Sequence, residues 1–213
     1  MPRILPPSEL RDLFFQNVPE PVLMDTAKVA IGSYVEAFKY CCDNFPGPEA
    51  HDIYPQIRRV MFERNWRGRI SRYPGVTLEA MPNAIDNCYH GELTAGRVVM
   101  TVSAVESPGK VVREAVFRTG LARDSQMNLY GEAAPPPAAA ALYAILVHGP
   151  LGFMLPSPGF LHVAFPASDC DSYVDRFNLL DYFPVLRAEL EGLPKLPERK
   201  EPRIRRDRDR KAE

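Results

Sequence analysis

A chain of 213 residues, 46% hydrophobic and 25% charged, has the composition of a globular protein with a sizeable core. Its formal net charge of −1 excludes a protein that is basic throughout, and no segment approaches the roughly 20 apolar residues of a membrane span. Proline, with 22 residues, is about twice as frequent as its usual share of roughly 5%, so we expect short, often interrupted elements.

The cysteines and the N-terminal sequence indicate a cytoplasmic protein. The first residues contain no continuous apolar stretch of the length that a secretory signal needs. Four cysteines (Cys41, Cys42, Cys88 and Cys170) do not form a disulfide-dense framework, and a bridge between adjacent Cys41 and Cys42 would be strained. We therefore expect reduced, buried thiols.

The first strong helical pattern follows a proline-rich N-terminal segment over residues 1–24, which has room for a short helix after Ser8. Apolar residues recur at spacings of three and four from about Asp25 to Asp43, and the sequence NFPGP ends the pattern. This spacing predicts an amphipathic helix.

A second helix is predicted from about Pro55, a favoured first-turn residue, to about Arg67. At 100° per residue, Phe62 and Trp66 lie on the face opposite its aliphatic stripe. We expect the aliphatic stripe to face the core, and it consists of Ile57, Val60 and Met61.

The period then changes to one that favours strands. The segments 97–105 (RVVMTVSAV) and 111–122 (VVREAVFRTGLA) are rich in β-branched residues and are joined by ESPGK. They predict an antiparallel hairpin in which Met100 lies opposite Phe117 on an apolar face.

The last third of the chain alternates strands with loops. The alanine- and proline-rich segment 131–141 has a loop composition, and Leu142–His148 is apolar on both faces, which predicts a buried strand. Phe160–Phe165 is predicted as a neighbouring strand, and a last helix is expected from about Ser168 or Asp169 to Asp181. Residues 194–213 form a tail with nine basic and five acidic residues, which we expect to be disordered or a solvated helix.

These elements predict a single α+β domain over residues 25–193. Its core is expected to be a mostly antiparallel sheet of four to five strands, with N-terminal helices and a C-terminal helix. The proline-rich segment 1–24 precedes this domain and the charged flexible tail 194–213 follows it.

No established catalytic motif is present, so the histidines are the residues from which an enzyme would have to be built. His148 ends an apolar strand just before a Gly-Pro loop, where functional side chains often emerge. His162 alternates with Leu161 and Val163 and so faces away from them. If the two strands are neighbours, these imidazoles, or His90, are candidates for a general base. The alternative is that they are structural histidines.

A metal site is a weaker alternative. Its candidate ligands lie on separate elements, so sequence spacing does not test whether they converge. The sequence therefore specifies no metal site and no cofactor. The candidates are Cys88, His90, His148 and either Cys170 or His162.

The sequence departs most from its background composition between residues 58 and 73, where six arginines and three aromatic residues surround one acid, Glu63. Guanidinium groups pair with phosphates, aromatic faces stack on bases, and both types of residue also dominate protein interfaces. Alternatively, the aromatic residues pack beneath another element and the arginines pair with acids. The candidate interface consists of Arg58, Arg59, Phe62, Trp66, Arg67, Arg69 and Arg72.

We therefore predict a cytoplasmic binding or regulatory protein. Its partner is expected to be a protein or a nucleic acid, engaged through this arginine- and aromatic-rich patch, with no membrane involved. The alternative is a small hydrolase-like enzyme that uses His148, His162 or His90, with or without a metal. The sequence specifies neither the partner nor the oligomeric state.

Overall fold

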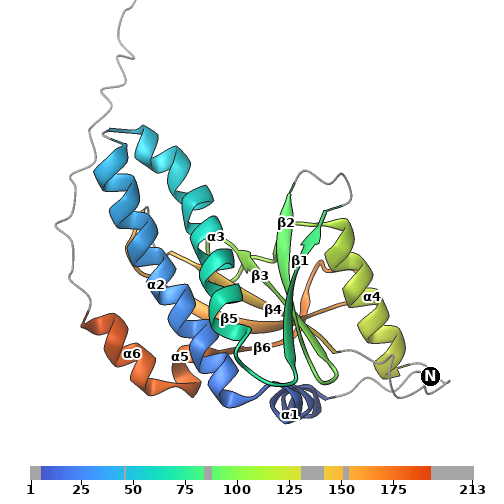
Figure 1. Cartoon of the computed structure of the whole chain (residues 1–213). Helices are drawn as coiled ribbons and strands as arrows, with labels where there is room; N and C mark the ends of the chain where they lie inside the picture. Colours follow the sequence, from blue (N-terminus) through green and yellow to red (C-terminus); the bar gives the residue numbers. More distant parts are fainter. Residues whose placement is uncertain (1–5, 46, 84–87, 131–141, 151–153, 193–213) are drawn as a thin grey trace, which may run out of the picture.

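Six strands form one sheet in which the order across the sheet is the order along the chain (Figure 1). The computed structural model describes residues 6–45, 47–83, 88–130, 142–150 and 154–192. The strands are β1 (Val76–Pro82), β2 (Tyr89–Ala95), β3 (Val98–Ala104), β4 (Leu142–Gly149), β5 (Phe160–Pro166) and β6 (Tyr173–Asn178). The mixed, mostly antiparallel architecture is as expected, but the sheet has six strands where four to five were predicted.

The sheet consists of two antiparallel meanders joined by one parallel pair. β1, β2 and β3 are antiparallel to one another in turn, as are β4, β5 and β6. β3 and β4 run parallel, and the chain passes between them through helix α4 (Val116–Tyr130). A parallel pair needs such a crossover because the chain must return to the same end of the sheet.

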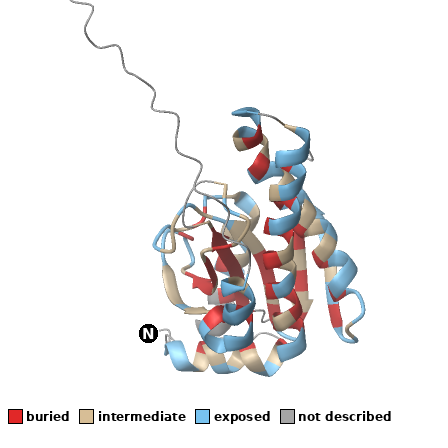
Figure 2. Ribbon diagram, turned by 90° about the vertical axis from the view of Figure 1, so that its left-hand side faces the viewer, coloured by how far each residue is buried: buried red, intermediate tan, exposed pale blue. Residues whose placement is uncertain are grey.

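Most of the helices cover the face of the sheet opposite α4. They are α1 (Pro7–Asn17), α2 (Glu20–Asn44), α3 (Glu49–Ile70), α5 (Leu179–Tyr182) and α6 (Pro184–Glu191). Their buried side chains share one hydrophobic cluster with Leu93, Met100 and Leu146 of the sheet, whereas Ala122 of α4 packs with Tyr143 on the other face. Figure 2 shows the buried residues on the strands and on the helix sides that face them.

The predicted N-terminal helices are present. α2 extends from Glu20 to Asn44, with proline in its first turn, and buries its small and apolar residues at spacings of three and four. α1 contributes Leu10 and Phe14 to the same hydrophobic cluster. The described part of the proline-rich segment is therefore packed against the rest of the fold.

Helix α3 buries the opposite face from the one predicted. It begins at Glu49 rather than Pro55, and its aromatic residues face the core, with Trp66 fully buried and Val60 63% exposed. Large rings bury more apolar area than Val or Met, so they decide which face packs. The indole nitrogen of Trp66 donates a hydrogen bond to Thr26 Oγ1 on α2 at 2.9 Å.

The predicted hairpin between segments 97–105 and 111–122 is wrong. β3 instead pairs with β2 and β4, and the second segment leads into α4 at Val116. β4 is buried along its whole length, so it needs a partner on each edge, and β3 supplies one of them. That competition between distant segments leaves no local trace in the sequence.

The two predicted strands β4 and β5 are confirmed as antiparallel neighbours, but the helix expected over 168–181 is wrong. Tyr173–Asn178 forms β6, followed by the short helices α5 and α6. The spacing of Tyr173 and Phe177 imitates a helical stripe, yet β6 pairs with the free edge of β5. The predicted loop 131–141 and tail 194–213 lie outside the described residues.

Two further features concern the expectations of no membrane span and of reduced cysteines. Among the described helices, none is long and apolar enough to cross a membrane. All four cysteines are free thiols, with Cys41 and Cys170 buried and Cys42 exposed.

Candidate functional site

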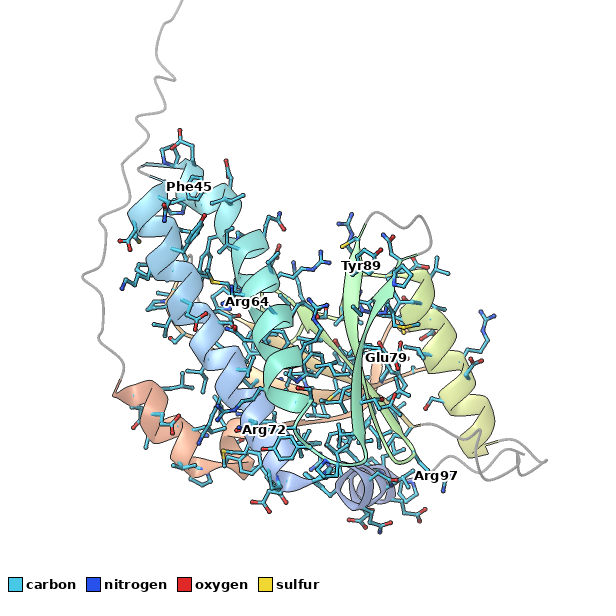
Figure 3. The ribbon with its side chains drawn as sticks, viewed as in Figure 1. Phe45, Arg64, Arg72, Glu79, Tyr89 and Arg97 are labelled. Atoms are coloured by element: carbon cyan, nitrogen blue, oxygen red, sulfur yellow. The ribbon has the colours of Figure 1, made fainter. Side chains whose placement is uncertain are left out.

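β2 and β3 separate partway along the sheet and form a fork. Their pairing stops at Leu93 and Met100, although β2 stays paired with β1 as far as Tyr89 and β3 stays paired with β4 as far as Ala104. The first half of β2 and the second half of β3 therefore diverge. Figure 3 shows Tyr89 at this end of the sheet and Arg97 at the opposite end.

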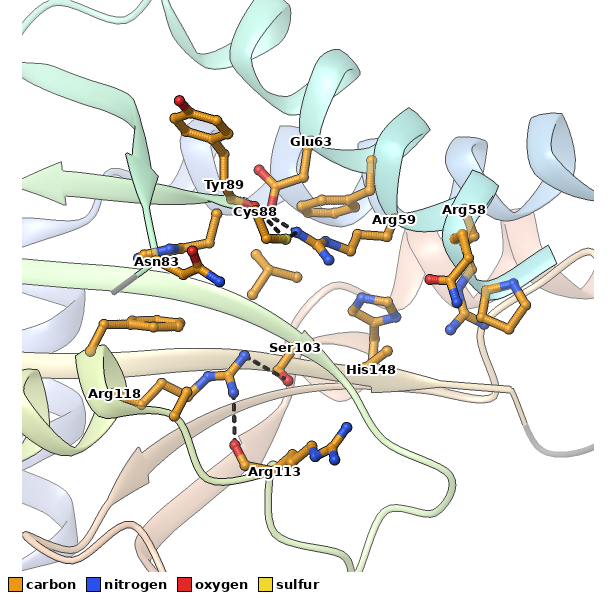
Figure 4. Close-up of a pocket in the computed structure, with 18 of the residues that line it drawn as sticks. Arg58, Arg59, Glu63, Asn83, Cys88, Tyr89, Ser103, Arg113, Arg118 and His148 are labelled. Atoms are coloured by element: carbon orange, nitrogen blue, oxygen red, sulfur yellow. Dashed lines mark hydrogen bonds between the residues drawn. The ribbon is translucent and has the colours of Figure 1, made fainter. Parts of the chain in front are cut away.

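A cavity of about 710 Å³ occupies the fork. One wall comes from α3 and the other from the segment that enters α4, with the start of β2, the end of β3 and His148 of β4 between them (Figure 4). The volume lies within the usual range for ligand pockets, roughly 300–1,000 Å³.

The cavity carries a marked excess of positive charge. Four arginines line it, two from α3 and two from the segment 113–118, and Glu63 is the only acidic side chain among the described residues of the lining. Within the described residues, no carboxylate lies within 4.0 Å of any of the four. The four are Arg58, Arg59, Arg113 and Arg118.

Arg118 is held by neutral acceptors only. Its two Nη atoms donate to the carbonyl oxygen of Arg113 at 2.7 Å and to Ser103 Oγ at 3.3 Å. Its Nε is buried with no hydrogen-bond partner among the described residues. Burial is the main cause that lowers the pKa of Arg118, and the charge of Arg59 acts in the same direction. The guanidinium is thus fixed in direction while its charge is not compensated.

Arg59 ties α3 to the start of β2 across the cavity. Its Nη2 donates to the Cys88 thiol and to the carbonyl oxygen of Tyr89, the latter at 2.6 Å. Neither acceptor is a carboxylate. The exposed guanidinium of Arg59 and the more buried one of Arg118 therefore lie on opposite walls of the fork (Figure 4).

Arg58 and His148 form the inner end of the cavity. Arg58 is only 6% exposed, and its guanidinium lies 4.5 Å from the ring centre of Tyr34 and 5.4 Å from that of Tyr54. The Tyr34 hydroxyl and His148 Nδ1 are 2.9 Å apart. Burial and then the charge of Arg58 lower the pKa of His148 to about 3. His148 is therefore neutral at physiological pH.

His90 lines the cavity from β2, on the α4 side. Its ring stacks on Phe117, with 3.6 Å between ring centres, and its Nε2 is buried without a hydrogen-bond partner among the residues described. The Nε2 lies 4.0 Å from Glu92 Oε2, which is too far for a hydrogen bond. Burial, then Arg118 and Arg59, lower the pKa of His90.

The predicted histidine pair does not converge. His148 faces α2 and α3, where it contacts Tyr34 and Phe62, whereas His162 pairs in register with Val147 and faces the α4 side. His162 contacts Phe160, with 5.3 Å between ring centres, and is not part of the cavity. Within the described chain, no three His, Cys, Asp or Glu side chains form a group that would hold a metal ion.

The seven residues of the predicted interface separate into four environments. Phe62 and Trp66 are buried in the core, although Phe62 also borders the cavity, so neither offers an exposed face for base stacking. Arg58 and Arg59 line the cavity, and Arg69 and Arg72 both bind Asp25 of α2. Arg67 is exposed and donates to the carbonyl oxygen of Glu63.

The sequence did not reveal Arg113 and Arg118 as site residues. They lay in a segment predicted as a strand, and nothing in the local pattern shows that it turns back towards α3. Pro-Gly at 108–109 indicated a turn but not the direction in which the chain continues after it.

No protein-family model, no curated protein and no solved structure matches this chain, so its own geometry is the basis for a functional proposal.

Proposed function

We propose that this protein is a binding protein that recognises a partner protein through an anionic group inserted into the cavity of the β2–β3 fork. The observation that carries the proposal is the set of four lining arginines with no carboxylate within ion-pair distance among the described residues. Arg58 is buried and Arg118 is partly buried. Removing their charge from water without an opposite charge is costly, and a bound anion offsets that cost.

A protein partner fits this site better than a nucleic acid does. Nucleic acids bind along grooves that combine phosphate contacts with free aromatic faces. Here the two central aromatic residues of α3 are buried, and Arg69 and Arg72 are paired with Asp25. The cavity is concave, and its rim carries the exposed side chains of Tyr89 and Val116, the former of a type enriched in protein interfaces.

Binding is also favoured over hydrolysis by the state of the histidines. A general base works best when its pKa lies near the operating pH, and that of His148 is lowered to about 3. His162 lies on the other face of the sheet. The enzyme alternative therefore retains His90 and His148 as cavity residues but loses their predicted companion.

The proposal is tested by affinity capture with matched charge reversals. We expect wild-type protein to retain partners that Arg59→Glu and Arg113→Glu fail to retain, because both exposed residues line the cavity. Arg123→Glu, on the exposed side of α4, is the control and should retain them. Equal capture by all four proteins would contradict the proposal.

A second measurement separates the two classes of partner. Fluorescence anisotropy of labelled DNA and RNA across a salt series should show no binding in the micromolar range. Salt-sensitive micromolar binding that Arg59→Glu abolishes would instead make the partner a nucleic acid.

A further inference from the structure

We propose that the anion is a phosphate monoester, bound in the fork between Arg118 on α4 and Arg59 on α3. This inference rests on the proposed function, because it concerns the same cavity and specifies the chemistry of what enters it. Charge, geometry, topology and volume each support it.

The charge of the lining calls for more than one negative charge. Glu63 is the only acidic side chain among the described lining residues, against four arginines. Burial raises the pKa of its carboxyl group, which reduces its ability to balance their positive charge. A single carboxylate would neutralise one guanidinium and leave the others uncompensated. A phosphate monoester carries about −1.5 to −2 charges at pH 7 and three acceptor oxygens.

The donors surround the cavity rather than lying in one plane. Figure 4 shows Arg59 reaching in from α3, Arg118 from the α4 side and His148 from β4 to one side of both. A planar carboxylate offers two oxygens in one plane, whereas a tetrahedral phosphate offers acceptors in three directions. Charge-assisted hydrogen bonds from arginine to phosphate are among the strongest in proteins.

Arg118 is already oriented for this contact. The carbonyl oxygen of Arg113 and the hydroxyl of Ser103 hold its Nη atoms, and its buried Nε still lacks a partner among the described residues. Holding the side chain beforehand reduces the entropy lost when a ligand binds.

The topology supports the same position. β3, α4 and β4 form the one parallel unit among the described strands, and the first turn of α4 lines the cavity just beyond the carboxyl end of β3. The carboxyl ends of parallel strands and the N-termini of the helices that follow them favour anions. Here that general preference coincides with the arginines of two helices.

The cavity is larger than a phosphate group. The remaining lining includes the apolar or aromatic side chains of Phe62, Tyr89, Val102 and Phe117. A volume of about 710 Å³ therefore accommodates both the phosphoryl group and the body of the molecule that carries it. Phenyl phosphate, a dianion on an aromatic ring, is the simplest probe with both parts.

Isothermal titration calorimetry tests the inference with phenyl phosphate and with phthalate, a dicarboxylate on the same ring. We expect phenyl phosphate to bind wild-type protein at least tenfold more tightly than phthalate does. Arg118→Gln should weaken phenyl phosphate binding by roughly 10- to 100-fold, as the loss of a charge-assisted contact does. The exposed Arg113→Gln is a second variant with little risk to folding, and Arg123→Gln is the matched control on α4.

The outcomes separate the two proposals. Equal or tighter binding of phthalate would overturn the phosphate inference and leave the anionic site intact. Failure of both compounds to bind would overturn both. Loss of binding in Arg123→Gln as in Arg118→Gln would also overturn the assigned position.

A phosphopeptide distinguishes the sources of the phosphate. A phosphotyrosine peptide that binds more tightly than phenyl phosphate, with its unphosphorylated form inactive, supports a phosphorylated partner protein. Binding of phenyl phosphate with no gain from the peptide supports a small phosphorylated molecule and removes the protein partner from the proposed function.

Discussion

Gly91 allows β2 to pass close to Glu63 and Trp66 of α3. A Cβ atom at this position would lie 2.6 Å from Glu63 Oε2 and 2.9 Å from Trp66 Cζ3. We expect Gly91→Ala to lower the free energy of unfolding by about 1–3 kcal/mol, because the buried indole has no room to shift. Urea denaturation followed by tryptophan fluorescence measures the change.

Gly68, which lies on helix α3, provides the control. Nothing lies within 4 Å of a Cβ atom placed there, and the position is exposed. Gly68→Ala should therefore leave stability unchanged or raise it by up to about 1 kcal/mol through helix propensity. A Gly91→Ala variant as stable as this control would show that α3 and β2 are not in close contact.

His148 should make stability depend on pH. Its pKa is about 3 in the folded protein, against 6.5 for an ordinary histidine, with Tyr34, Arg58 and Phe62 around it. Between these values the unfolded chain binds a proton that the folded chain does not. Stability should thus be full above about pH 6.5 and fall by up to about 1.4 kcal/mol per pH unit below it.

The measurement compares urea unfolding of the wild type and His148→Gln between pH 7 and pH 4. Glutamine does not titrate, so the variant should show a slope that is smaller by about one proton in this range. Identical slopes would mean that His148 is accessible to water in its charged form.

At the scale of single residues, the sequence identified which residues are unusual better than it predicted where they lie in the fold. His148 was identified as a strand-end residue that borders a loop, and it does line the cavity. Arg58 and Trp66 were identified as unusual, but the sequence could not show whether they face water or core. That choice depends on which face of α3 the distant β2 contacts.

Asp25 of α2 links that helix to the C-terminal end of α3 through hydrogen bonds. It accepts hydrogen bonds from Arg69, Arg72 and Tyr73, and Figure 3 shows Arg72 beside α2. Burial raises the pKa of Asp25, but these three donors outweigh it and the net shift is downward. A lowered folded pKa means that the carboxylate stabilises the fold above about pH 4 and less at lower pH.

We expect Asp25→Asn to lower the free energy of unfolding by about 1–3 kcal/mol at pH 7, with a smaller loss near pH 3. Asp181→Asn is the control, since Asp181 forms an exposed pair with Arg187 on α6 and should change stability by less than about 1 kcal/mol. Chemical denaturation at both pH values makes the comparison. Equal effects of the two substitutions would show that Asp25 is not a structural link.

The elements that could be predicted from the sequence are those with many apolar residues of their own. α2, β4 and β5 carry enough apolar residues to be identified locally, and each is present close to its predicted range. β1, β2 and β6 interrupt their apolar residues with Glu, Gly, Asp or Arg, so they resemble loops or helices until a neighbouring strand pairs with them. The fork itself depends on where such pairing stops, which no local pattern encodes.

Thiol reactivity reports on the molecule as a whole. Cys41 is buried between α2 and α3 and Cys170 on the α4 side of the sheet, and burial raises the pKa of both thiols. We expect a disulfide reagent to modify Cys42 at once and Cys88 more slowly in the folded protein. Cys41 and Cys170 should react only as the chain unfolds.

Absorbance at 412 nm with Ellman's reagent counts these thiols over time, with and without urea. Cys42→Ser removes the fast phase and identifies it. Phenyl phosphate should slow modification of Cys88, which lines the cavity, without changing Cys42. Four rapidly reacting thiols in native buffer would contradict the packing of α2 on α3 and of Cys170 on the α4 side of the sheet.

The parallel contact between β3 and β4 has a consequence for assembly. Each meander pairs strands that follow one another along the chain, and such neighbours find each other quickly because little chain separates them. Among the pairs formed by the described strands, only β3–β4 joins segments on either side of the interval between Tyr130 and Leu142. A chain cut in that interval would leave two pieces with intact meanders, which we expect to rejoin through the β3–β4 hydrogen bonds and the hydrophobic cluster that both pieces share.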